Sequence, residues 1–131
     1  MRSSLLAAAL VLATVVAGPA FASERGQPYS DADFKAAQKN GEPILVDVTA
    51  SWCPTCKRQG EVLSGLFEQG RFEDLTVFEV NYDDQKEAVR AFRAPRQSTL
   101  VVYRGEEETG RAVAITTEDD IAELIETAYS E

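Results

Sequence analysis

The sequence contains no histidine. This absence excludes catalysis by Ser-His and Cys-His pairs, and it excludes zinc or haem sites that depend on imidazole ligands. Basic residues are also few, since 13 lysines and arginines stand against 22 aspartates and glutamates, for a net charge of −9. So acidic a surface repels phosphate backbones, and we therefore expect no nucleic-acid binding.

Cysteine is rare as well, and the two cysteines, Cys53 and Cys56, permit a single disulfide. A chain of 131 residues is long enough for one domain with its own core and needs few covalent cross-links. Closing so short a loop removes little entropy from the unfolded chain, roughly 2 kcal/mol against about 4 to 5 kcal/mol for a long loop. The spacing therefore favours a disulfide that opens and closes over a structural cross-link.

The one long apolar run lies at the N-terminus of the sequence. A single positive charge precedes apolar residues 5–16, and the small-x-small triplet Ala20-Phe21-Ala22 follows. This pattern predicts a cleaved secretory signal peptide over residues 1–22 and a single domain over residues 23–131. The alternative is an uncleaved segment that tethers the protein to a membrane, because the run is nearly long enough to span a bilayer. Export leads to a compartment where disulfides persist, the periplasm if the source is a Gram-negative bacterium.

Helix and strand signals alternate through the rest of the chain. In order, they predict a helix capped by Ser30 and ended by Asn40-Gly41, a buried strand over Ile44 to Thr49, a helix from Pro54 to Gln69, a strand over Leu75 to Tyr82, a helix over Asp84 to Phe92, a hairpin of Thr99 to Tyr103 with Thr109 to Ile115, and a last helix capped by Thr117. Helix-length crossovers join the early strands. The order predicts an α/β fold, with a mixed central sheet of about four strands and helices on both faces.

Both cysteines fall where the first strand gives way to a helix. A helix N-terminus places unpaired N–H groups and about half a positive charge beside a thiolate, which is the species that attacks. Cys53, at the helix start, is therefore the expected nucleophile, and Cys56, one turn in, the resolving thiol. Pro54 holds the turn between them. Lys57 either adds positive charge to the site or is an ordinary solvated helix residue.

The segment Trp52-Cys53-Pro54-Thr55-Cys56-Lys57, with Asp47 six residues before the first cysteine, resembles the active-site region of the thioredoxin-fold family. The resemblance extends over Asp31 to Ala128 and includes the hairpin and terminal helix after Ser98-Thr99-Leu100. It implies a thioredoxin fold whose active group is a redox-active Cys53-Cys56 disulfide, without another cofactor and without a metal. The Pro54-Thr55 dipeptide also resembles that of exported thioredoxin-like reductases of cytochrome c maturation.

The same resemblance implies roles for residues outside the motif. Asp47 would lie below the resolving cysteine and take or give its proton, and burial would raise the pKa of this carboxyl. Glu79 aligns with a lysine that lies near the buried aspartate in the family. Either Glu79 shares the space with Asp47, so that their titrations couple, or it points to solvent. Trp52 would pack beside the cysteines and shield them; on composition alone it is equally a core aromatic.

Ser98 stands where family members usually carry a cis-proline that faces the cysteines. A competing alignment places Pro95 there, but it needs extra residues before Thr99. A cis peptide bond before a residue other than proline costs about 2.5 to 4 kcal/mol, so we expect either a trans bond or a strained one held by its neighbours. The loop of Ser98 and Thr99 would line the groove for an extended client peptide.

Together these features predict an exported, monomeric thiol-disulfide oxidoreductase that reduces disulfides of envelope proteins through Cys53 and Cys56. Its partners would be client proteins with cysteines or disulfides and a membrane thiol electron donor. The alternatives are a thiol oxidase or isomerase, a protein whose thiolates bind a metal or an iron-sulfur cluster across a dimer, and a thioredoxin-like adaptor with inert cysteines. Two cysteines without histidine make a poor zinc site, since zinc normally takes four ligands.

Overall fold

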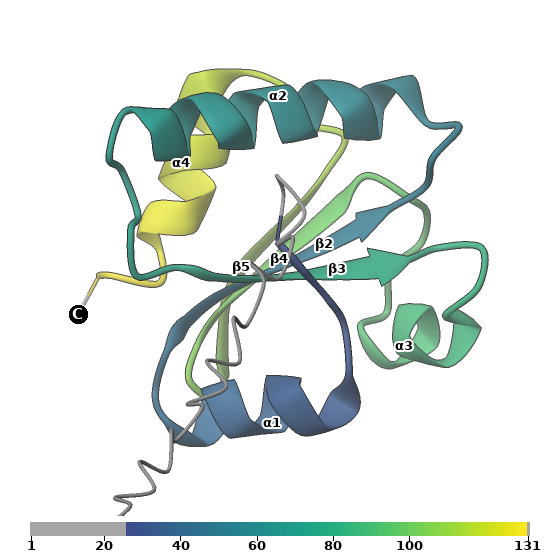
Figure 1. Cartoon of the computed structure of the whole chain (residues 1–131), viewed down its shortest axis with the longest axis horizontal. Helices are drawn as coiled ribbons and strands as arrows, with labels where there is room; N and C mark the ends of the chain where they lie inside the picture. The colour runs from purple at the N-terminus through teal and green to yellow at the C-terminus, as the bar shows by residue number, and fades with distance from the viewer. Residues whose placement is uncertain (1–25, 131) are drawn as a thin grey trace, which may run out of the picture.

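A five-stranded mixed sheet forms the middle layer of the molecule, with the strand order β1-β3-β2-β4-β5 (Figure 1). The computed structural model describes residues 26–130, so the predicted signal peptide lies outside the described residues. The elements are β1 (Gln27–Pro28), α1 (Asp31–Lys39), β2 (Pro43–Thr49), α2 (Pro54–Glu68), β3 (Thr76–Asn81), α3 (Lys86–Ala91), β4 (Thr99–Arg104), β5 (Glu107–Val113) and α4 (Glu118–Glu126). Within residues 26–130, no helix is both long and apolar enough to cross a membrane.

The sheet confirms the predicted α/β architecture and adds one short edge strand. β2 pairs in parallel with β3 and antiparallel with β4, and β4 and β5 form an antiparallel hairpin. The addition is β1, which pairs in parallel with β3 through Gln27 and Pro28. Two residues, one of them a proline, carry no alternating pattern, so no strand was predicted there.

Two predicted helix starts are confirmed by their side-chain caps. The Ser30 hydroxyl accepts a hydrogen bond from the backbone N–H of Asp33 at 3.1 Å, at the start of α1. The Thr117 hydroxyl accepts the equivalent bond from Asp120 at 3.2 Å, at the start of α4. Each cap satisfies a donor that the first helical turn leaves unpaired, which is why these residues mark the boundaries in the sequence.

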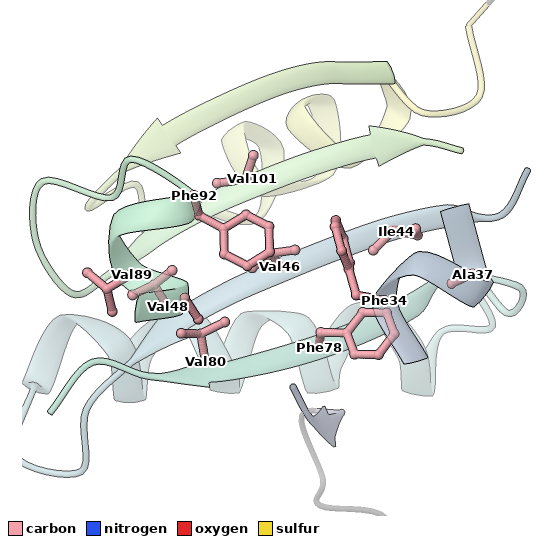
Figure 2. Close-up of a cluster of buried hydrophobic side chains, with 11 residues drawn as sticks. Phe34, Ala37, Ile44, Val46, Val48, Phe78, Val80, Val89, Phe92 and Val101 are labelled. Carbon is pink, nitrogen blue, oxygen red and sulfur yellow. The ribbon is translucent and has the colours of Figure 1, made fainter. Parts of the chain in front are cut away.

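Helices cover both faces of the sheet, with α1 and α3 on one side and α2 and α4 on the other (Figure 1). Under α1 and α3, a cluster of apolar side chains is built around aromatic rings (Figure 2). The rings of Phe34 and Phe92 meet edge to face, with centroids 5.2 Å apart. Burying each such side chain contributes about 1.5–3 kcal/mol to folding, so this layer stabilises the packing of α1 and α3 on the sheet.

The alternation of β2 decides which residues face the other helix layer. Ile44, Val46 and Val48 belong to the cluster under α1 and α3, whereas Leu45 packs with residues of α2 and α4. Successive side chains of a strand point to opposite faces, so Asp47 shares the face of Leu45. The one acidic residue of this strand is therefore directed toward the layer that contains the cysteine helix.

Replacing Gly65 with alanine is expected to stabilise the protein by about 0.5–1 kcal/mol, because glycine in a helix interior keeps more freedom in the unfolded chain. A Cβ at Gly65 would meet nothing within 4 Å. Gly110→Ala is the matched control and should lower the melting temperature, since its Cβ would lie 2.9 Å from Leu124 Cδ1 and 3.2 Å from Thr127 Oγ1. Thermal unfolding of both variants checks the pair, and a Gly65→Ala variant that melts earlier contradicts it.

Candidate active site

The two cysteines form a disulfide at the junction between β2 and α2. Cys53 is the N-cap of α2, and Pro54 is the first helical residue. Its lack of an N–H costs no hydrogen bond there, because the N–H groups of the first turn have no partner within the helix. The Cys53 Sγ accepts a hydrogen bond from the backbone N–H of Cys56 at 3.1 Å. The positive end of the helix is thus aimed at this sulfur, and it stabilises negative charge there.

Cys53 and Cys56 are almost equally buried, but only Cys53 borders a cleft. Their relative exposures are 3% and 1%, so both are buried. Cys53, however, lines an open cleft of about 530 Å³. The residues that line this cleft are Pro28, Thr49, Ala50, Ser51, Cys53, Lys57, Glu79, Asn81 and Gln85. A sulfur that approaches through this cleft meets Cys53 first, in keeping with the order of attack expected from the sequence.

Asp47 and Glu79 lie side by side on the sheet face that α2 covers. They are register partners across the parallel strands β2 and β3, which places their backbones about 5 Å apart. Asp47 is fully buried, while Glu79 is half-buried and lines the cleft. Glu79 thus has features of both orientations considered for it, since it is on the same sheet face as Asp47 and also borders the open cleft. One carboxyl group therefore borders the cleft, and the other is buried next to it on the same face of the sheet.

Lys57 extends from the first turn of α2, where it is exposed, and it lines the same cleft as Glu79. Cys53 is thus flanked by one basic and one acidic side chain. The remaining motif residues are less buried than the cysteines: Pro54 is exposed and Thr55 is half-buried. The cleft therefore presents charge of both signs beside a nearly apolar disulfide.

Trp52 is 58% exposed, so the alternative of a core aromatic is wrong. Its indole N–H donates to Asp83 Oδ2 at 2.7 Å, which links the loop before α2 to the loop after β3. The two cysteines form a buried apolar cluster with Ala50, against which the partly buried Tyr82 packs. Trp52 therefore braces the loops around the disulfide.

Ser98 lies directly before β4 and is fully buried, as is Thr99. Every peptide bond among the described residues is trans, and Ser98 adopts a left-handed conformation with φ 61°. Its N–H donates to the Val48 carbonyl at 2.8 Å, at the end of β2. Neither Ser98 nor Thr99 lines the cleft beside Cys53. The exposed residues of this loop are Pro95 and Arg96, so they, and not the Ser98 side chain, are what a client would meet.

Several polar residues around the disulfide were not predicted from the sequence. Asn81 and Gln85 line the cleft, and Gln59 is fully buried in α2, one turn beyond Cys56. Gln59 had a detectable signal, because it interrupts the apolar stripe that Val62 and Leu66 continue. Asn81 and Gln85 had none, since polar residues at the end of a strand and at the start of a helix are normally solvated.

Among residues 26–130, no group of three or more cysteine, histidine, aspartate or glutamate side chains is arranged to hold a metal ion. The site as it stands brings together a disulfide, a helix N-terminus and two carboxyl groups. These are the elements needed for thiol-disulfide exchange, in which a thiolate attacks and a nearby acid or base handles the proton.

Comparison with known proteins gives a consistent result. The family model described as Thioredoxin matches residues 27–127. Thioredoxin H2-1 of Oryza sativa subsp. japonica is 34% identical over 87 residues, covering 66% of this chain and 61% of that protein. The thiol:disulfide interchange protein DsbE of Yersinia pestis is 38% identical over 73 residues, covering 55% of this chain and 37% of that protein. The chain therefore spans less than two thirds of the length of either relative.

Among solved structures, the crystal structure of Trxlp from Edwardsiella tarda EIB202 superposes with a TM-score of 0.72 at 47% sequence identity. The match covers 76% of this chain and 96% of that one. The residues matched by the family model, 27–127, include elements of all three layers of the fold and the strand-to-helix junction that carries the disulfide.

Proposed function

The chain belongs to the thioredoxin family of thiol-disulfide oxidoreductases, and from this premise we propose that it is exported and reduces disulfides of proteins in the cell envelope. One observation carries the chemical part of the proposal. The Cys53 sulfur caps α2, accepts the Cys56 N–H and borders the cleft, so it is both stabilised as an anion and open to a partner.

The first step is an attack by the Cys53 thiolate on one sulfur of a client disulfide. The client S–S bond breaks, a mixed disulfide forms between Cys53 and that sulfur, and the second client sulfur leaves as a thiolate that takes a proton from water. No net electron transfer to the solvent occurs. The helix N-terminus lowers the energy of the attacking thiolate before the step and is left facing a neutral sulfur after it.

The second step releases the client. Cys56 gives up its proton, attacks the Cys53 sulfur and forms the Cys53-Cys56 disulfide, while the client sulfur departs as a thiolate and is protonated. Two electrons have then passed from the protein dithiol to the client disulfide. Asp47, buried on the α2 face of the sheet, is the base proposed for the Cys56 proton, and Glu79 connects it to the cleft.

The reducing direction is supported by the Pro54-Thr55 dipeptide and by the similarity to thiol:disulfide interchange proteins. The alternative direction is oxidation or isomerisation of client thiols. An oxidase requires a more stable dithiol form, so a reduction potential of about −120 mV would exclude the proposal that the protein acts as a reductase. Equilibration with glutathione buffers of known ratio gives this potential directly.

Export is proposed from the pattern of residues 1–22, and it implies that the protein is recharged outside the cytosol by a membrane thiol donor. We propose further that the protein acts as a monomer on client proteins. Fractionation of cells that express the full chain tests the location. A protein confined to the cytosol would contradict export and would leave the exchange chemistry standing.

The decisive experiment for function is a trap with Cys56→Ser, expressed in its native compartment. Without the resolving thiol, mixed disulfides between Cys53 and clients cannot be released. Covalent adducts that disappear on reduction, and that contain envelope proteins, are the expected result. The double variant Cys53→Ser/Cys56→Ser is the control, and an equal set of adducts from both would contradict the proposal.

Asp47→Asn is predicted to slow release of the client by about 10²-fold or more, which is the usual contribution of a positioned base. The amide preserves the shape of the side chain and removes its ability to take the Cys56 proton. Rapid-quench analysis should show the mixed disulfide forming at its normal rate and then persisting. Glu79→Gln, one strand away, should have a smaller effect; an Asp47→Asn variant that resolves at the unaltered rate rules out the role.

A further inference from the structure

Gln59 makes long-range contacts that the exchange chemistry described above does not use. Its side-chain Nε2 donates to the Ser98 carbonyl at 3.2 Å and to the Ile115 carbonyl at 3.0 Å. Both N–H groups of the amide donate to carbonyl oxygens. This fixes which side of the amide faces the two loops, because the amide oxygen is an acceptor and could not bond to another carbonyl oxygen. One side chain of the active-site helix thus holds two separate loops, the one before β4 and the one after β5.

The two loops that Gln59 holds are both in an unfavourable backbone conformation. Ser98 has φ 61° and Ala114 has φ 60°, in the left-handed region that side chains other than glycine seldom adopt. The Ala114 N–H donates to the Ser98 carbonyl at 2.9 Å, so this carbonyl accepts from both Ala114 and Gln59. Residues in such conformations persist only where the surroundings hold them in place.

Burial makes Gln59 an unfavourable choice unless its hydrogen bonds matter. It is fully buried, and within the described residues its Oε1 accepts no hydrogen bond. An apolar side chain at this position would continue the stripe of α2 without leaving a buried acceptor unsatisfied. The two donated bonds, and the loops they hold, are what distinguishes glutamine from such a residue.

The Ser98 loop is hydrogen-bonded to the strand that leads to the disulfide, and the Ala114 loop is hydrogen-bonded to Ser98. The Ser98 N–H is bonded to Val48, at the end of β2, from which the chain runs directly into the turn that ends at Cys53. Pro95 and Arg96 on the first loop and Ala114 on the second are exposed. A protein that brings a disulfide to Cys53 would therefore cover these loop tips, whereas a small disulfide would not extend so far.

We propose that Gln59 is a positioning residue for protein clients, which acts by holding the Ser98 and Ile115 loops against the active-site helix. This inference rests on the proposed function, since it assumes that the substrates are proteins. Gln59 touches neither sulfur nor substrate in this arrangement. Its removal should therefore impair recognition of a protein disulfide more than it impairs the reaction of Cys53 itself.

The test compares kcat/KM for insulin, a protein disulfide, with that for the small disulfide 5,5′-dithiobis(2-nitrobenzoic acid). Gln59→Met keeps the length and volume of the side chain and removes both donors. We expect kcat/KM for insulin to fall about tenfold, mainly through KM, and that for the small disulfide to change less than about threefold. Gln69→Met, an exposed substitution at the end of the same helix, is the matched control and should leave the ratio unchanged.

Amide hydrogen exchange separates a positioning effect from general destabilisation. The Ala114 and Ser98 amides should exchange faster in Gln59→Met, while those in the middle of β2 keep their protection. An unchanged substrate ratio, or an equal loss of protection throughout the sheet, would overturn the role of Gln59. If Gln59→Met does not fold, Gln59→Leu repeats the comparison. Failure of the unaltered protein to reduce either disulfide would instead refute the proposed function.

Discussion

Cys53→Ser is expected to abolish disulfide exchange, with a loss in kcat/KM of more than about 10³-fold, because serine cannot supply the thiolate that attacks. Of the two cysteines, only Cys53 both caps α2 and borders the cleft. Cys56→Ser should lose turnover as well, yet retain the first step and release about one equivalent of thiol per protein. Stopped-flow measurement with a chromogenic disulfide distinguishes the two variants.

The contrast between these variants is the sensitive part of the prediction. If Cys56→Ser gives no burst while Cys53→Ser does, the nucleophile and the resolving thiol have been assigned the wrong way round. Their exposures, 3% and 1%, do not separate the roles; the N-cap hydrogen bond and the cleft do. The variants should have similar stabilities, since each removes the same short-loop disulfide, and unfolding in urea provides that check.

Local signals explain why most of the fold was predictable from the sequence. Ser30 and Thr117 cap their helices through contacts within one turn, and β2 is marked by an apolar run from Ile44 to Val48 that only Asp47 interrupts. Such features depend on neighbours in the chain, so the sequence displays them directly. The strand β1 is held by pairing with β3 far along the chain, and nothing in its own two residues records that partner.

The candidate site divides in the same way. The cysteines and Asp47 were found because a motif and a burial pattern mark them locally. The environment of Trp52 was not, since its partner Asp83 lies 31 residues away. Gln59 is held by carbonyls 39 and 56 residues distant, and only the completed β4–β5 hairpin brings both within reach. Long-range polar contacts are therefore the part of the site that required the structure.

At Ser98 this chain departs from the pattern that the resemblance to the family predicts. The sequence predicted either a trans peptide bond or a strained cis bond before Ser98. The bond is trans, and the strain lies instead in the left-handed backbone of Ser98. The strain is held by three backbone-directed hydrogen bonds, one from the Ser98 N–H and two to its carbonyl. This turn has become specific to its residue, and the residue usual in the family should no longer fit it.

Ser98→Pro is accordingly expected to destabilise the protein by about 3 kcal/mol or more, although the resemblance to the family suggests proline at this position. Proline fixes φ near −65°, whereas Ser98 has φ 61°, and proline lacks the N–H that donates to Val48 at 2.8 Å. Ser98→Gly is the matched control, because glycine adopts positive φ without strain, and it should stay within about 1 kcal/mol of the unaltered protein. Urea unfolding of the oxidised proteins measures both. A Ser98→Pro variant as stable as the glycine variant would mean that the turn adopts a new conformation that accepts proline. In that case neither the hydrogen bond to Val48 nor the one from Gln59 determines the conformation of this loop.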